Sequence, residues 1–204
     1  MDASDLSALL AHWPASLAPL RNLALRLLSR GASQRDDGAL LIGPTRWVGP
    51  EAHALVLFPP ARTEWVDQLP NATARPLPAH YAEVLRAMNG CFAFGLALFG
   101  LAPSLQADPP RLNRRALQPL DLGTANTVWV NEYRGPALSG SYIASRPYSR
   151  EANVGYFSSK GGDVRGILPD GSTVAVWASM EEMLASELAA AERRASEGTP
   201  AGLW

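Results

Sequence analysis

Residues 77–100, LPAHYAEVLRAMNGCFAFGLALFG, form the stretch that most constrains the fold. Pro78 suits the first turn of a helix, and apolar residues then recur at three- and four-residue intervals: Tyr81, Val84, Leu85 and Met88. Asn89 and Gly90 should end this helix, because glycine, and often asparagine, takes the left-handed conformation that closes a helix C-terminus. The apolar run 92–99 alternates small and large side chains and has the length of a strand. The stretch therefore predicts a core helix that turns sharply into a buried strand.

The composition indicates a globular chain without an electrostatic preference for nucleic acid. The 204 residues are 47% hydrophobic and 18% charged, so we expect a sizeable core. The formal net charge is -1, whereas nucleic-acid binders usually carry a basic face. The densest basic patch has no aromatic residues interleaved with it, and a solvated loop is its simpler interpretation: Arg111, Arg114 and Arg115. We expect no nucleic-acid partner.

Few residues suggest catalysis or metal binding. Cys91 is the single cysteine, and we interpret it as a buried, small hydrophobic residue. The three histidines are scattered along the chain and read as ordinary surface or core-edge residues: His12, His53 and His80. The sequence holds neither a GxSxG nor an HExxH motif. We therefore expect no enzyme, no metal and no cofactor.

The chain also lacks the sequence signs of a membrane or secreted protein. No apolar stretch reaches the ~18 residues that a membrane-spanning helix needs. Acidic Asp2 and Asp5 stand where a secretory signal would carry positive charge. The expectation is a cytoplasmic protein with no membrane contact.

The first 60 residues predict helices followed by two strands. Residues 4–30 carry leucines at helical spacing, and Pro14 and Pro19 interrupt them, which predicts two helices or one kinked helix that stops at Gly31. We expect the leucines to cover the protein's own sheet; the alternative is a docked partner helix. A polar loop should occupy residues 31–38. Two short strands follow it, residues 39–42 and 54–58.

The rest of the chain predicts helices around a meander of strands. A short helix is expected over residues 61–69 and an irregular, proline-rich loop over 102–119. Residues 121–133 fit a strand or a helix, and we favour the helix because Asp121 is a good N-cap. Short β-prone runs with turn sequences between the last three predict an antiparallel meander: residues 142–144, 154–157, 164–168 and 173–177. A capping box then starts a final helix that ends near residue 194: Ser179 and Glu182.

Two groups of residues resemble the SUKH superfamily, the Smi/Knr-like proteins. The first is the Leu-Pro at 77–78, the tyrosine three residues later, the helix ending in Asn-Gly and the strand ending in Leu-Phe-Gly at 98–100. The second lies near the C-terminus: Gly161-Gly162-Asp163, Asp170-Gly171, residues 174–177 and an acidic helix with Glu181, Glu182, Met183 and Leu184. The resemblance covers residues 61–194.

The resemblance implies a fold and a domain organisation. We expect an α+β fold of SUKH-like type, in which helices pack around a mainly antiparallel sheet of five to six strands. Residues 1–60 would be an N-terminal extension packed on the core, residues 61–194 the SUKH-like domain and residues 195–204 a loose tail.

The resemblance also implies a binding function. Many bacterial members are immunity proteins that bind and neutralise a toxin domain, often a nuclease, and some members elsewhere are scaffolds in regulatory assemblies. We expect a non-catalytic immunity protein with a cognate toxin as its partner; the alternative is a scaffold or adaptor, and a monomer and a homodimer both remain open. Interfaces of this kind use aromatic anchors and rim charges, for which the candidates are Trp129, Glu132, Tyr133, Tyr142, Tyr148, Tyr156 and Asp163, with Trp47 and Asp170 beside them. Each candidate also has a plain alternative as a core or turn residue.

Overall fold

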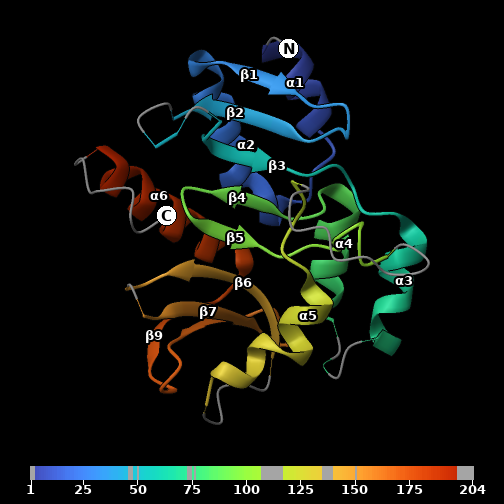
Figure 1. Ribbon diagram of the computed structural model, residues 1–204, viewed down its shortest axis with the longest axis vertical. Coiled ribbons are helices and arrows are strands. Elements are labelled where there is room, and N and C mark those ends of the chain that lie inside the picture. The colour runs from blue at the N-terminus through green and yellow to red at the C-terminus, as the bar shows by residue number, and fades with distance from the viewer. Residues whose placement is uncertain are drawn as a thin grey trace.

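One antiparallel sheet runs through the whole computed structural model, which describes residues 3–45, 48–49, 51–72, 75, 77–106, 117–134, 140–149 and 151–196. Each strand pairs with the next one along the chain, so that the spatial order follows the sequence from β1 to β9 (Figure 1). The strands are β1 (Ala32–Gln34), β2 (Leu40–Pro44), β3 (His53–Leu57), β4 (Cys91–Ala93), β5 (Leu96–Leu98), β6 (Ser141–Pro147), β7 (Asn153–Ser158), β8 (Val164–Ile167) and β9 (Thr173–Trp177). The predicted α+β class is confirmed.

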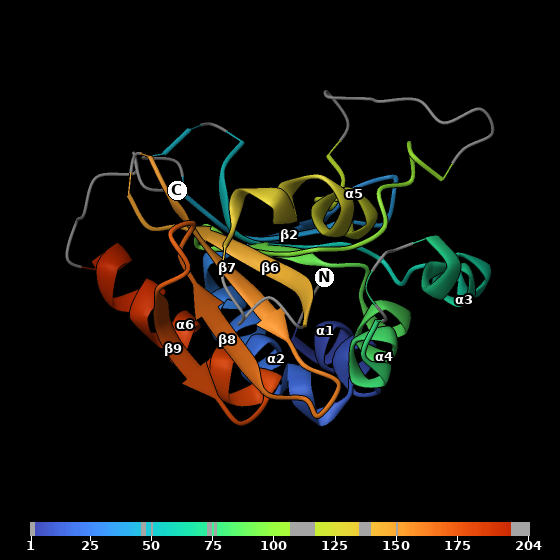
Figure 2. The same cartoon turned by 90° about the horizontal axis from the view of Figure 1, so that it is seen from below.

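Helices cover both faces of this sheet. Figure 2 shows α1, α2, α4 and α6 on one face and α5 on the other. The α-helices are α1 (Ala3–Leu10), α2 (Ala18–Leu27), α3 (Thr63–Ala72), α4 (Ala79–Ala87), α5 (Leu122–Thr127) and α6 (Met180–Ser196). Single turns of 3-10 helix extend them: η1 (Ala15–Leu17), η2 (Leu28–Arg30) and η3 (Trp129–Glu132). No helix of the described residues has the length and apolarity to cross a membrane.

The N-terminal helices form as the prolines predict. Pro14 precedes η1, Pro19 is in the first turn of α2, and Gly31 ends η2 with a φ of 106°. Most leucines of this segment are buried in the main core, so they cover the protein's own sheet as predicted: Leu6, Leu10, Leu17, Leu20, Leu23 and Leu27. The boundary expected at residue 60 falls between β3 and α3, and the sheet continues across it.

The central stretch forms the predicted helix but not the predicted single strand. Tyr81 on α4 is fully buried, and its hydroxyl lies 2.6 Å from the carbonyl oxygen of Phe99 and 2.9 Å from that of Ile143. The run 92–99 does not continue straight, because positive φ angles at Phe94 (47°) and Gly95 (87°) reverse the chain into the β4–β5 hairpin. The small and large residues that alternate in sequence face one another across this hairpin: Cys91 and Leu98, Phe92 and Ala97, Ala93 and Leu96.

The side chain of Asn89 joins the end of α4 to the end of β5. Its amide nitrogen donates to the carbonyl oxygen of Leu101 at 2.9 Å, and its amide oxygen accepts from the Leu101 N–H at 2.6 Å. Gly90 follows with a φ of 82°, and a Cβ there would lie 2.6 Å from the carbonyl oxygen of Leu98. A Cβ at Gly100 would overlap the backbone of Asn89. Asn89, Gly90 and Gly100 are therefore needed together, because backbone segments meet here without room for a side chain.

The sheet is larger than the five to six strands predicted. The run 92–99 supplies two strands instead of one, and the segment predicted as a polar loop at 31–38 contains β1. The side chains of β1 are largely solvent-exposed, as is usual for a short edge strand, and its backbone pairs with Leu40, Leu41 and Ile42. The sequence did not predict this strand, because its largely polar side chains form no hydrophobic pattern.

The C-terminal half agrees with the sequence in its elements. Residues 122–127 and 129–132 are helical, and the Asp121 carboxylate accepts from the Thr124 N–H at 2.7 Å and caps α5. The four predicted strands of the meander correspond to β6–β9. At the start of α6, Ser179 accepts from the Glu182 N–H at 3.2 Å, and the Glu182 carboxylate accepts from the Ala178 N–H at 2.9 Å. The tail expected at 195–204 lies outside the described residues beyond Ser196, the last residue of α6.

Candidate functional site

Two of the candidate tyrosines lie in an aromatic cluster between η3 and the sheet. Tyr133 and Tyr142 are 4% and 3% exposed, and their hydroxyl oxygens are 3.0 Å apart. Tyr142 stacks on Phe157 with ring centroids 4.8 Å apart, and Tyr133 meets Phe157 edge to face. Burial raises the pKa of both phenols. The structure therefore places both side chains in the core, which is the alternative that the sequence left open.

Tyr156 is also fully buried, and it lies close to α6. Its hydroxyl accepts from Nε of Arg146 at 2.7 Å, and the same nitrogen lies 2.7 Å from the Glu187 carboxylate of α6. Burial raises the pKa of Tyr156, and the charge of Glu187 adds to the effect. This tyrosine anchors α6 to β6 and β7.

The remaining candidates that the structure describes are at least partly accessible, but they do not form one cluster. Tyr148 is 51% exposed in the β6–β7 turn, and Glu132 is exposed at the end of η3. Tyr148 and Glu132 lie toward the same end of β7. Tyr133 directly follows Glu132, and its hydroxyl is 3.4 Å from the carbonyl oxygen of Asn153, the first residue of β7. Trp129 is half-buried and packs edge-on against Phe99.

Asp163 sits beyond the opposite end of β7. Its carboxylate accepts from the Ser159 hydroxyl within the β7–β8 turn and lies 3.5 Å from Nε of Arg165. Asp170 is fully exposed, and its bonds to Ser172 lower the pKa of its carboxyl within the β8–β9 turn. Trp47 lies outside the described residues.

Sequence reasoning missed an exposed apolar area on the last strands, which we name the β9 surface: Arg165, Val174 and Val176. Val174 is 40% exposed and Val176 is 60% exposed. The register places Val176 beside Arg165, Arg165 beside Phe157, and Phe157 beside Tyr142, so a buried aromatic row continues outward onto this surface. The sequence TVAVW showed a strand, but it does not show that the strand ends the sheet.

His80 contacts a serine that the sequence did not pair with it. The ring nitrogen Nε2 lies 3.0 Å from the Ser158 hydroxyl oxygen, and burial lowers the pKa of this imidazole while the charge of Glu83 opposes the shift. Ser158 has no exposed surface, so a substrate does not reach its hydroxyl. The pair connects α4 to β7 and is a structural contact. Cys91 is equally enclosed, and burial raises the pKa of its thiol to about 12.

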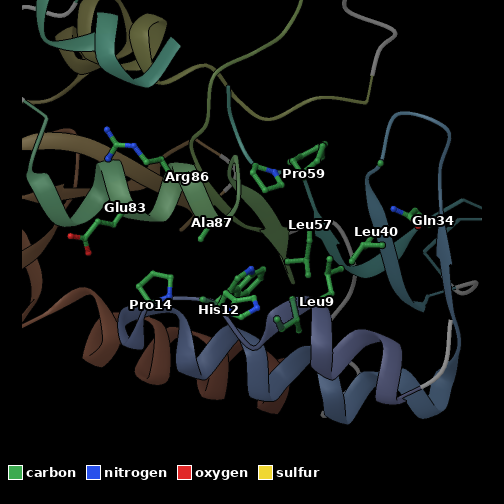
Figure 3. A pocket seen from close by; sticks show the side chains of 15 residues that line it. Leu9, His12, Pro14, Gln34, Leu40, Leu57, Pro59, Glu83, Arg86 and Ala87 are labelled. Atoms are coloured by element: carbon green, nitrogen blue, oxygen red, sulfur yellow. The ribbon is translucent and has the colours of Figure 1, made fainter. Parts of the chain in front are cut away.

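A groove of about 580 Å³ opens between α1, the edge of the sheet and α4 (Figure 3). We name it the α1–α4 groove. Its walls are mainly apolar, and four of the lining side chains are polar or charged: His12, Gln34, Glu83 and Arg86. The other lining residues are Leu9, Leu10, Trp13, Pro14, Gly38, Leu40, Leu57, Phe58, Pro59, Pro60 and Ala87. These residues come from segments far apart in the chain, which is why no local motif revealed the groove.

The β9 surface and the α1–α4 groove are both candidate sites, and the strand and the helix after which they are named, β9 and α1, lie at opposite ends of the molecule (Figure 1). Within the described ranges, no three side chains of histidine, cysteine, aspartate or glutamate gather as a metal site would require. No family model, curated protein or solved structure matches the chain.

Proposed function

We propose that the chain is a non-catalytic binding protein that contacts another protein through the β9 surface. The observation that carries the proposal is the pair of exposed valines, Val174 and Val176, on the last strand of the sheet. The strand TVAVW has neither the lysine nor the proline with which edge strands are commonly protected from pairing. An apolar edge of this kind is suited to burial against a partner, with Arg165 and Asp163 as charges at its margin.

The resemblance to SUKH immunity proteins supports a toxin domain as the partner. In this proposal the chain belongs to a bacterial toxin–immunity pair and neutralises the toxin by covering its surface. Tyr148 is the remaining exposed aromatic candidate, and its turn joins the same end of the sheet as the start of β9, because Gly155 pairs with Ile167 and Ile167 with Thr173. It would extend the contact as an aromatic anchor.

Co-expression tests this function. The product of the gene immediately next to that of this chain is expressed alone and together with the chain, and growth is followed. We expect growth arrest by the neighbour alone, relief by the chain, and a stable one-to-one complex on size-exclusion chromatography. Persistent arrest despite abundant, folded chain would refute neutralisation. Recovery of a stable assembly of housekeeping proteins without any toxic neighbour would favour the scaffold alternative.

A further inference from the structure

The α1–α4 groove has the size of a small-molecule site and lies apart from the β9 surface. Ligand pockets commonly have volumes of roughly 300–1,000 Å³ with apolar walls and a few polar groups. The groove, at about 580 Å³, falls inside that range. Leu9 is 52% exposed at its edge, so apolar side-chain surface is open to a ligand.

The charge at the margin of the groove is negative. Glu83 and Arg86 both come from α4, but Figure 3 shows the Glu83 side chain on the side of α4 that faces Pro14, with its carboxylate at the margin of the groove, whereas the Arg86 guanidinium extends to the other side of the helix. Arg86 donates to the Asp67 carboxylate at 2.9 Å, which balances its charge. A ligand in the groove therefore meets a carboxylate, and a positive charge on the ligand complements it.

Other groups in the lining suit the same kind of ligand. Trp13 contributes an aromatic ring, whose face attracts organic cations. His12 and Gln34 supply hydrogen-bonding groups at the rim, and the leucines and prolines accept an apolar body. The contributing segments are the end of α1 with Pro14 after it, β1 and β2, the end of β3 with the two prolines after it, and α4.

We propose that the α1–α4 groove binds a small organic cation: an amine with an aromatic or alkyl body that lies against the leucines and Trp13, and an ammonium group that pairs with Glu83. This binding activity is separate from the protein contact at the β9 surface, and neither depends on the other.

A matched series of probes tests the charge preference. 2-Phenylethylamine, 2-phenylethanol and 3-phenylpropanoate share an apolar body and differ in charge, and each is titrated into the ¹⁵N-labelled protein while amide chemical shifts are followed. We expect the amine to bind about fivefold more tightly than the alcohol, the size of a partly exposed ion pair, and the carboxylate to bind more weakly than both. The shifts should concentrate at Leu9, Trp13 and Ala87.

Two variants separate the charge from the cavity. Glu83→Gln should weaken amine binding about fivefold and leave the alcohol unchanged, because only the ion pair is lost. Glu181→Gln, an exposed carboxylate on α6 away from the groove, is the control and should change neither. Ala87→Trp should fill the groove and abolish binding of every probe, with thermal unfolding used to verify that the variant is folded.

Three results would overturn the proposal. The first is equal affinity for amine, alcohol and carboxylate, and the second is amine binding that Glu83→Gln leaves intact. The third is binding by none of the probes. If, in that case, a protein partner protects the groove from hydrogen exchange, the groove is a protein contact instead. None of these results bears on toxin neutralisation, which is measured by growth.

Discussion

Asn89 illustrates how single polar residues fix the central stretch. The sequence predicted its place at the end of a helix, and α4 does end there. Its second task, two hydrogen bonds to the backbone of Leu101, joins residues twelve positions apart and depends on the β4–β5 hairpin between them. Local turn chemistry therefore predicts the residue type but not its contacts.

Replacing Asn89 with alanine should destabilise the fold. The buried N–H and C=O groups of Leu101 would each lose a partner, so we expect the free energy of unfolding to fall by about 2 to 4 kcal/mol. Urea denaturation measures this change. Asn22→Ala, at an exposed position of α2, is the control and should have an effect within about 0.5 kcal/mol. Similar losses in the two variants would contradict the role assigned to Asn89.

Tyr81, like Asn89, has a position that the sequence predicts and contacts that it does not predict. Helical spacing predicted its burial, which the structure confirms, whereas its contact with the Ile143 carbonyl joins residues 62 positions apart. The aromatic candidates of the interface were harder to sort, because tyrosine suits a core and a surface equally well. Tyr133, Tyr142 and Tyr156 are core residues, and Tyr148 is exposed.

At the scale of elements, two ion pairs of equal length connect α6 to the rest of the molecule. Glu187 lies 2.7 Å from Arg146 of β6, with side chains 8% and 16% exposed. Glu192 lies 2.7 Å from Arg26 of α2, with side chains 35% and 56% exposed. The two ion pairs differ in burial. Burial decides whether the charge that remains after its partner is removed can be solvated by water.

Removal of the two glutamates should have unequal effects. Glu187→Ala leaves the largely buried Arg146 without its carboxylate and should lower the free energy of unfolding by about 2 to 4 kcal/mol. Glu192→Ala removes an exposed pair and should cost at most about 1 kcal/mol. Chemical denaturation of both variants makes the comparison, and equal costs would contradict the view that burial makes the Arg146 pair the stronger anchor.

The elements that the sequence missed share a physical cause. The β4–β5 hairpin turns at Phe94 and Gly95. Phenylalanine is not a residue type that indicates a turn, so the positive φ at Phe94 could not be predicted. The polar β1 carries no hydrophobic pattern, and its existence depends on pairing with β2. By contrast, α4, α5 and α6 were predictable because their caps and spacing are local.

At the scale of the whole molecule, buried phenols and one thiol make the fold sensitive to alkali. Burial raises the pKa values of Tyr81, Tyr142 and Tyr156, and it raises that of Cys91 to about 12. Because these groups keep their protons when folded and release them near pH 9 to 10 when unfolded, the stability that they provide is full below that range. It is lost as the pH rises from there.

We therefore expect the free energy of unfolding, measured by urea denaturation, to fall steeply between about pH 9 and pH 11, by roughly 1.4 kcal/mol per pH unit for each group that is titrating only in the unfolded chain. Cys91→Ala should show a shallower decline between pH 9 and 10, since one of these groups is gone. Rapid reaction of the folded protein with a thiol reagent at pH 9 would contradict the enclosed position of Cys91.

The sequence indicated an α+β molecule with an antiparallel meander, and the structure confirms both. The α1–α4 groove was not predictable, because residues from Leu9 to Ala87 meet only when α1 and α4 pack on the same face of the sheet (Figure 2). The β9 surface was not predictable either, because the outer position of β9 follows from the order of all the strands.

The most direct test of the proposed function is calorimetric titration of the neighbouring gene's product into the chain and two variants. Val176→Lys places a charge on the β9 surface, whereas Leu9→Lys places one at a similarly exposed apolar residue of α1, a helix at the opposite end of the molecule from β9 (Figure 1). We predict that Val176→Lys weakens binding at least about tenfold and that Leu9→Lys leaves it unchanged, as expected for a charge buried in an interface core. Unchanged binding by Val176→Lys, or loss of binding by Leu9→Lys alone, would contradict the account.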